Sequence, residues 1–235
     1  MAVALAEAGV TTFVAARRRD RLDALAAAHR GVRPVTADLL DPNDLRRVTD
    51  LITEYDIDLV VNNAGFGTTG RFDRLDPDRL EREIRLNVTA LTRLSHAALA
   101  VMIPRRRGWL LNVSSVASFQ PAPRLAVYAA TKAYVTSLSE SLHEEAKPSG
   151  VHVTALCPGL TKTEFQTVSN TSSYADRFPD AAWTDPDLVV RTGLSAVVAN
   201  RALAVPGLQY RAMSAVVNVT PRWVKRLVSA KVQRG

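Results

Sequence analysis

Two side chains that could move a proton, Tyr128 and Lys132, lie four residues apart in the sequence. Apolar residues follow at helical spacing, which predicts a helix that carries the phenol and the ammonium on one face. A free tyrosine has a pKa of about 10 and is a poor acid near neutrality. A neighbouring ammonium favours the phenolate and lowers that pKa. The pair is therefore a candidate for proton transfer to a substrate oxygen, although the same spacing also fits an ordinary packing or solvated pair.

Further polar residues stand directly after strand-like hydrophobic runs. These are the segments 62–65 (Asn-Asn-Ala-Gly), 114–115 (Ser-Ser) and 157–163, which begins Cys-Pro-Gly and contains Thr161 and Thr163. Asn87 differs from them, because it lies within a predicted helix. Ligands of open α/β sheets bind at the carboxyl ends of the strands. The three segments therefore lie where a ligand would bind.

Short β-branched runs alternate with helical stretches along the chain. Strands are expected at 10–16, 32–37, 57–62, 109–113, 151–157 and, more weakly, 202–205. Helices are expected at 20–28, 43–55, 78–102, 128–147 and 187–200. This alternation indicates βαβ units, and strands that are apolar on both faces indicate helices on both sides of a parallel sheet. We predict an α/β, doubly wound parallel sheet in a single domain over 1–235.

The composition narrows the class of protein. The chain has 235 residues, is 47% hydrophobic and carries one cysteine, Cys157, which fits one buried domain in a reducing, cytoplasmic setting. The net charge of +7 would suit nucleic acid, a membrane surface or phosphorylated ligands. No nucleic-acid motif accompanies it, so we predict no nucleic-acid partner and a mainly solvated charge. No metal site is predicted, because His and Cys are scattered.

The order and spacing of these pieces resemble the short-chain dehydrogenases/reductases from Ala4 nearly to the C-terminus. The matching pieces are Asn-Asn-Ala-Gly at 62–65, Asn87, Ser115 thirteen residues before Tyr128, Tyr-x-x-x-Lys at 128–132 and Pro-Gly at 158–159. Each piece alone has a structural explanation, but the set in this order favours function. The resemblance implies a Rossmann-like fold and nicotinamide-dependent interconversion of an alcohol with a ketone or aldehyde.

The resemblance also implies roles for four residues. Tyr128 would be the general acid and base, and Ser115 would hydrogen-bond the reacting oxygen. Lys132 would bind the nicotinamide ribose and lower the pKa of Tyr128. Asn87 would hold a water that links Lys132 to solvent.

Cofactor contacts follow in the same way. Arg17 ends the second strand of the family layout, where an arginine accommodates a 2′-phosphate, so we predict NADP(H) in preference to NAD(H). The alternative is a basic loop on a basic protein. The other implied cofactor contacts are Asp38, Leu39, Asn63, Ala64, Gly65, Pro158, Gly159, Thr161 and Thr163, together with Tyr128 and Lys132.

The family's first strand and its Thr-Gly-x-x-x-Gly-x-Gly turn have no counterpart here. Residues 1–8 match the end of the first family helix instead. The segment 65–70 fits G-x-G-x-x-G, but no helix opens directly after it, so we reject it as the dinucleotide turn. We expect an N-terminally truncated sheet with unmade ladder hydrogen bonds and weak cofactor binding. The alternative function is a non-catalytic relative that binds a ligand or partner.

Three further expectations concern the surface. The segment 164–185 carries Phe165, Tyr174, Phe178 and Trp183, which favour a lid over an apolar alcohol or ketone, or else anchor the segment. The resemblance implies a homo-oligomer paired through 78–102 and 128–147, where Leu91, Leu94, Leu138 and Leu142 are apolar unless they face the sheet. The tail 220–235, started by Thr220-Pro221, predicts a basic amphipathic helix that touches a membrane surface or packs on the protein.

Overall fold

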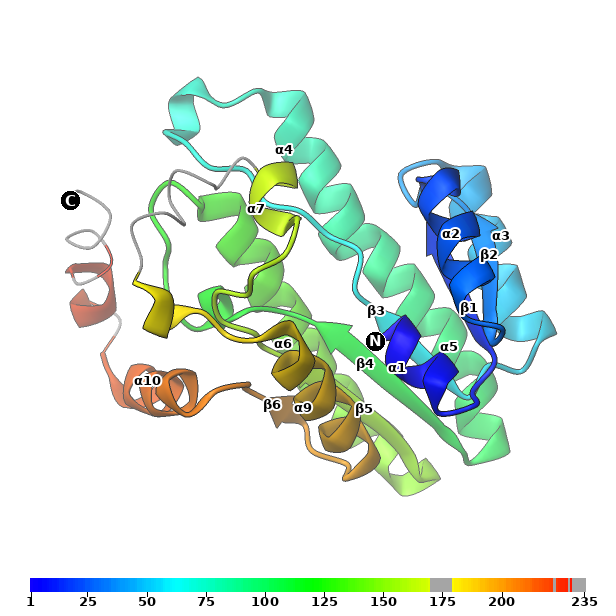
Figure 1. Ribbon diagram of the computed structural model, residues 1–235. Helices are drawn as coiled ribbons and strands as arrows, with labels where there is room; N and C mark the ends of the chain where they lie inside the picture. The colour runs from blue at the N-terminus through cyan, green and yellow to red at the C-terminus, as the bar shows by residue number, and fades with distance from the viewer. Residues whose placement is uncertain (170–178, 222, 228, 230–235) are drawn as a thin grey trace. The chain divides into compact units, whose positions relative to one another are not determined.

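The computed structural model describes residues 1–169, 179–221, 223–227 and 229. The chain forms two compact units, Met1–Tyr55 and Asp56–Gly235. Both units are built from parallel strands and helices (Figure 1). The predicted α/β class is therefore confirmed, whereas the single-domain organisation over 1–235 stays a prediction.

The N-terminal unit alternates helices with two parallel strands. Its elements are α1 (Ala2–Glu7), β1 (Thr12–Ala16), α2 (Arg19–Ala28), β2 (Val32–Thr36) and α3 (Pro42–Glu54). Thr12 of β1 lies opposite Val32 of β2, and α1 and α2 both contact the two strands. Helix α3 starts where the sequence indicates, because the Asp41 carboxylate accepts hydrogen bonds from two backbone N–H groups of the first turn.

The C-terminal unit holds a four-stranded parallel sheet in the order β3-β4-β5-β6. Its strands are β3 (Leu59–Asn62), β4 (Gly108–Val113), β5 (Val151–Leu156) and β6 (Leu203–Ala204). Its helices are α4 (Pro77–Ile84), α5 (Leu91–Arg105), α6 (Ala126–Ala146), α7 (Phe165–Val168), α9 (Pro186–Val198) and α10 (Leu208–Val219), with short 3₁₀ turns at Phe72–Arg74, Val116–Phe119, Lys147–Ser149 and Asp180–Ala182. Within the described residues, β1 and β3 each pair with one strand only.

Helices cover both faces of this sheet (Figure 1). Successive strand residues point to opposite faces. Asn112 of β4 hydrogen-bonds Ser139 of α6 on one face, and α5 packs on the same side through Ser95. Its neighbour Leu111 points the other way, against Gly193 of α9. The doubly wound arrangement predicted from the apolar strands is confirmed.

Most element boundaries lie within two residues of those expected, but the helix expected at 78–102 is different. It consists of α4, a π-helical segment Arg85–Ala90 and α5, which continues to Arg105. This is also the one described helix whose length and composition would suffice to cross a membrane. Its α5 part contacts β3 and β4 and buries Ala98 and Met102, as a core helix does. Helix α10 was not predicted.

Two surface predictions need correction. Leu91 and Leu94 are 4% and 7% exposed within this chain, so they face its core and the prediction that they pair subunits is wrong. Leu138 and Leu142 are partly exposed. Thr220 does not cap the tail helix, because its hydroxyl donates to the Val216 carbonyl of α10.

The tail itself stays untested as a membrane contact. Its first helical hydrogen bond runs from Lys225 N to Pro221 O, as the proline predicts. Trp223 and Leu227 are exposed, whereas Val224 is half-buried. Residues 222, 228 and 230–235 of the predicted stripe and its basic flanks lie outside the described residues.

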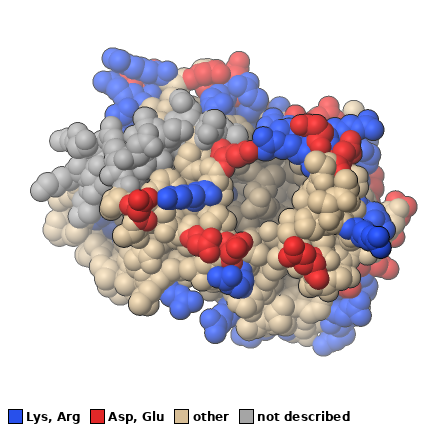
Figure 2. All heavy atoms as spheres, in the orientation of Figure 1, with Lys and Arg blue, Asp and Glu red and all other residues tan. Residues whose placement is uncertain are grey.

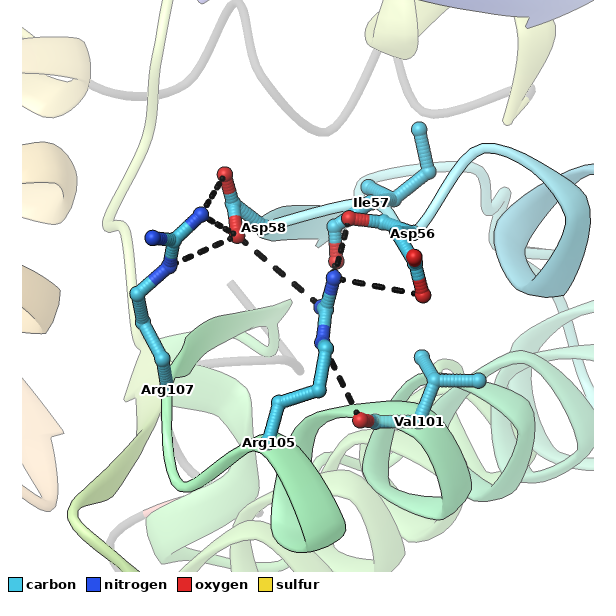
Figure 3. Close-up of polar contacts among 6 residues, drawn as sticks. All are labelled: Asp56, Ile57, Asp58, Val101, Arg105 and Arg107. Carbon is cyan, nitrogen blue, oxygen red and sulfur yellow. Dashed lines mark hydrogen bonds and ion pairs between the residues drawn. The ribbon is translucent and has the colours of Figure 1, made fainter.

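The basic cluster 105–107 is part of the fold (Figure 3). Arg107 donates to both carboxylate oxygens of Asp58 at 2.9 Å each, and Arg105 donates to the backbone carbonyls of Asp56, Ile57 and Val101. We call Arg105, Arg107, Asp56 and Asp58 the arginine clasp. It ties the end of α5 to the loop before β3, so these cations are occupied. On the face shown in Figure 2, basic and acidic side chains are interspersed, which suits a solvated charge.

Candidate active site

The predicted Tyr–Lys pair lies in the first turns of α6. Lys132 is buried, and its Nζ donates to the carbonyl oxygen of Val113, the last residue of β4, at 2.7 Å. The same Nζ lies 5.8 Å from the centroid of the Tyr128 ring. The two side chains therefore share one face of the helix, at the carboxyl end of β4.

The two serines after β4 have separate tasks. The Ser115 hydroxyl accepts a hydrogen bond from Ala117 N at 3.2 Å, and its interaction with Tyr128 lowers the pKa of the phenol. Ser114 is buried, and its hydroxyl donates to the Lys132 carbonyl at 2.8 Å and contacts Thr136 Oγ1 at 2.7 Å. Ser114 therefore fixes α6 against β4, which places Tyr128 beside Ser115.

Asn87 lies in the π-helical segment, a feature frequent at functional sites. Its Nδ2 donates to the Phe66 carbonyl at 2.8 Å and to Thr131 Oγ1 at 3.1 Å, and its Oδ1 accepts from Phe66 N at 3.1 Å. Asn87 thus joins the segment after β3 to the residue preceding Lys132. The structure brings Asn87, Tyr128 and Lys132 together, as the sequence predicts.

The glycines after β3 allow main chain to approach these side chains. A Cβ on Gly65 would lie 2.9 Å from Asn87 Oδ1 and 3.6 Å from Lys132 Nζ. A Cβ on Gly67 would lie 3.0 Å from the Tyr128 ring. Gly65 and Gly67 therefore serve this close approach. No α-helix begins until Pro77, in agreement with our rejection of the segment as a dinucleotide turn.

Burial dominates the ionisation of the pair. It raises the pKa of Tyr128 to about 12, against the effect of Ser115 and together with the Glu83 charge. It lowers the pKa of Lys132 to about 8, although Cys157 and Glu83 act in the opposite direction. The predicted lowering of the Tyr128 pKa is therefore wrong for this state of the protein, because loss of solvent outweighs the favourable interactions. At neutral pH the tyrosine holds its proton and the lysine is charged.

A buried network of amide and hydroxyl side chains connects the elements that carry the site, and it was not predicted. Asn62 Nδ2 donates to Asn112 Oδ1 at 2.9 Å and to Ser95 Oγ at 3.1 Å, and Asn112 Nδ2 donates to Ser139 Oγ at 3.0 Å. The network joins β3 and β4 to α5 and α6. Small polar residues on the buried faces of these helices were the available sequence signal. Asn63 and Ala64, the next two residues, are exposed.

The residues after β5 form a tightly held turn. A Cβ on Gly159 would overlap the Tyr210 ring, whose hydroxyl accepts from Leu160 N at 3.1 Å. Pro158 is half-buried, and Thr161 hydrogen-bonds the Gly159 carbonyl at 3.1 Å. Helix α10, through Tyr210, therefore shapes this turn, which the sequence did not indicate.

The segment that is predicted to form a lid lies partly within the described residues. Thr163 accepts from Phe165 N at 3.2 Å at the start of α7, and the Phe165 ring lies 5.6 Å from the Tyr128 ring, centroid to centroid. Buried Ser169 accepts from Gly67 N at 2.9 Å. Tyr174 and Phe178 lie outside the described residues. The described part of this segment therefore contacts Tyr128 and the glycine segment.

Three predicted cofactor residues belong to the N-terminal unit. Arg17 is exposed and directly follows β1. Asp38 and Leu39 follow β2, where the Asp38 carboxylate accepts from Leu40 N at 3.0 Å and Asp38 N donates to Asp44. Each therefore stands beyond the carboxyl end of its strand, as expected.

The described residues fit one half of a nicotinamide dinucleotide. The Lys132 ammonium and the Tyr128 hydroxyl offer polar groups for ribose hydroxyls, beside Gly65 and Gly67, where no Cβ intrudes. The sequence has no glycine-rich turn between a strand and a helix for the pyrophosphate. Among the described residues, no three His, Cys, Asp or Glu side chains gather as metal ligands.

A separate cavity of about 380 Å³ lies between α9, β6 and α10. It is lined by none of the predicted site residues but by three arginines, Arg191, Arg201 and Arg211, among others. We place the candidate chemistry at Tyr128 instead, because the cavity lining holds neither an acid–base group of suitable pKa nor a nucleophile with an adjacent base.

Known proteins resemble the chain in sequence and in fold. The short chain dehydrogenase family profile matches residues 1–173. An uncharacterized oxidoreductase of Myxococcus xanthus is 38% identical over 176 residues, which cover 72% of this chain and 70% of that protein.

Two solved structures extend the likeness. A short-chain dehydrogenase from Sphingobium yanoikuyae in complex with NADPH is 32% identical, with a TM-score of 0.82 over 91% of this chain and 86% of that one. The bulky-bulky ketone specific alcohol dehydrogenase from Comamonas testosteroni is 27% identical, with a TM-score of 0.76 over 93% and 88%. The family profile, the bacterial relative and the solved structures all indicate the same family. The chain belongs to the short-chain dehydrogenase family of oxidoreductases.

Proposed function

We propose that the protein is an NADP(H)-dependent oxidoreductase that interconverts an apolar alcohol with its ketone or aldehyde, using Tyr128 as general acid and base. One observation carries the proposal. Tyr128 lies beside the Lys132 ammonium and the Ser115 hydroxyl at the carboxyl end of β4. A phenol in this position can give its proton to a carbonyl oxygen, because the neighbouring ammonium favours the phenolate that forms.

In the reducing direction, Tyr128 gives its hydroxyl proton to the substrate oxygen while Ser115 hydrogen-bonds the same oxygen. The phenolate that results is stabilised by the buried ammonium of Lys132. A bound nicotinamide would supply the hydride, with Lys132 and Tyr128 holding its ribose. Asn87, fixed to Phe66 and Thr131, keeps the glycine segment and α6 in register around this group.

The NADP(H) preference rests on Arg17. Its exposed guanidinium follows β1 directly, and a guanidinium fork matches a phosphate. The relative from Sphingobium yanoikuyae was solved with NADPH, which supports the same cofactor here.

The proposal of an apolar substrate rests on Phe165, which packs on Tyr128, and on half-buried Trp183. The Comamonas testosteroni neighbour, specific for bulky ketones, supports this class.

A panel of apolar ketones with NADPH tests the proposal in the wild type and in Tyr128→Phe. Loss of the proton donor should lower turnover by about 10²- to 10⁴-fold while NADPH binding, followed by fluorescence, persists. The matched control is Tyr134→Phe on the same helix, whose hydroxyl meets Thr92 instead of the site. Retained turnover in Tyr128→Phe would show that another residue is the acid.

A non-catalytic relative is the second candidate. In that case the protein would bind an apolar ligand or a partner, and no ketone would be reduced by the wild type.

We also propose a homo-oligomer in which α6 contributes its partly exposed Leu138 and Leu142. Sedimentation velocity that shows only monomer would contradict it.

A further inference from the structure

A carboxyl group without a role in the mechanism above lies beneath the site. Glu83, in the last turn of α4, is 0% exposed, and neither carboxyl oxygen has a hydrogen-bond partner among the described residues. The buried hydroxyl of Thr68, which follows Gly67, also lacks one by distance and angle, although its hydrogen-bonding interaction with the Glu83 carboxyl lowers the pKa of that group. Buried polar groups are nearly always paired, and a buried charge is costly when it is not. Glu83 therefore needs an explanation.

The position of Glu83 on its helix connects it to the site. Asn87 follows four residues later, and both side chains are buried, at 0% and 1% exposure. Spacing of four places them on one side of the helix. Helix α4 packs against α6, which carries Tyr128 and Lys132. Glu83 is thus one turn away from an established contact of α6.

The charged and titratable groups that act on Glu83 come from two helices. Burial raises the pKa of Glu83 to about 7, and Thr68, Arg79 of α4 and Lys132 of α6 lower it, in that order of size. The effect is reciprocal, because Glu83 raises the pKa of Tyr128 and that of Lys132. Cys157 also raises the pKa of both groups, so Glu83, Tyr128, Lys132 and Cys157 are coupled ionisable groups.

We propose that Glu83 is a positioning residue that acts on the Tyr128–Lys132 pair through its charge, as a further ionisable group of the site. The ionised carboxylate holds the proton on the Lys132 ammonium, and the ammonium is what stabilises the phenolate of Tyr128. The carboxylate touches neither substrate nor cofactor. Its part in turnover rests on the proposed function, whereas its effect on Lys132 does not.

Removal of the Glu83 charge should change the pH profile of kcat/KM mainly on its alkaline side. Without the carboxylate, Lys132 would lose its proton at lower pH, and the alkaline limb of kcat/KM would move down with it. The acid side should change little, because Lys132 is charged there with or without Glu83. A residue that only fills space would leave both limbs in place when replaced by an isosteric amide.

Lysine Cε NMR titration measures this without substrate or cofactor. The Lys132 resonance is assigned with Lys132→Arg and followed in the wild type, Glu83→Gln and Glu81→Gln. Glu81 is the matched control, because it is an exposed carboxylate on the same helix. We expect the Lys132 pKa to fall by about 1 in Glu83→Gln and to stay unchanged in Glu81→Gln. An unchanged Lys132 in Glu83→Gln overturns the proposal.

Two further measurements distinguish a failure of the Glu83 proposal from a failure of the proposed function. Titration of Glu83 itself in the wild type, by its carboxyl carbon, should give a midpoint near 7, and an ordinary carboxyl midpoint overturns the proposal even when Glu83→Gln does not fold. The alkaline limb of ketone reduction should move by the same amount as the Lys132 midpoint, and a limb that stays in place overturns the role in turnover. A moved Lys132 midpoint in a protein that reduces no ketone supports the charge coupling and refutes the proposed function.

Discussion

The two ends of the β3–β6 sheet treat charge in opposite ways. At the amino ends, the arginine clasp holds exposed Arg107 against Asp58 and half-buried Arg105 against backbone carbonyls. At the carboxyl ends, Lys132 and Glu83 are buried, and Glu83 has no hydrogen-bond partner within the described residues. The first group is paired in good geometry, whereas burial shifts the pKa values of the second.

This difference distinguishes charged residues that hold the fold together from charged residues that can take part in proton transfer. An exposed ion pair adds little free energy, and its contribution is to connect the segments that carry its two partners. Buried groups with few partners shift their pKa, and shifted groups are those that can exchange protons near neutrality. The basic cluster 105–107 thus belongs to the fold, whereas Lys132 and, as we propose, Glu83 belong to the site.

The largest expected effect is on catalysis. Lys132→Met should lower ketone reduction by about 100-fold or more, because the phenolate of Tyr128 loses its cation. Arg107→Met removes a cation of the arginine clasp and should leave kcat unchanged. Steady-state kinetics with saturating NADPH compares the two. Equal losses would mean that the two ends of the sheet do not differ in the way described.

The next effect is on stability and depends on pH. The pKa of Glu83 rises from 4.5 to about 7 on folding, so the native state binds more protons than the unfolded state between these values. Wild-type stability should therefore fall through this window, by about 3 kcal/mol relative to Glu83→Gln, and stay lower above it. Urea unfolding at both ends of the window measures the difference. A constant difference would show that Glu83 titrates normally.

The smallest effect lies within the arginine clasp. Arg105 is 26% exposed and donates to three backbone carbonyls, so Arg105→Ala should cost about 1–3 kcal/mol of unfolding free energy. Arg107 is 66% exposed, and Arg107→Ala should cost less than about 1 kcal/mol. Thermal or urea unfolding ranks the two. The reverse order would indicate that the bidentate pair with Asp58 matters more than the backbone contacts.

Much of this site could be predicted because its residues sit at strand ends. The alternation of apolar runs and helical stretches places Ser115 after β4, and the Tyr–Lys spacing places both groups on α6. Glu83 could not be found in this way, since Leu80-Glu81-Arg82-Glu83 has the composition of a solvated helix. Its burial comes from packing of α4 on α6, which the local sequence does not encode.

Two other misses have similar physical causes. The Tyr128 pKa was predicted to fall because the neighbouring ammonium is visible in the sequence, whereas the burial that outweighs it is not. Helix α10 was missed because its apolar residues do not mark one face. Val216 and Val219 are exposed, while Tyr210 is buried against Gly159. Periodicity indicates a helix only where one face meets the core.

The main chain at Gly65 and Gly67 limits how substrate range can change. A Cβ at either position would press on Asn87 or Tyr128. Substitutions at these two glycines therefore cannot be used to change the substrate range. New specificities have to come from other residues near Tyr128, such as Phe165 at the start of α7. The site thus has positions that cannot evolve by substitution and positions at which relatives can diverge.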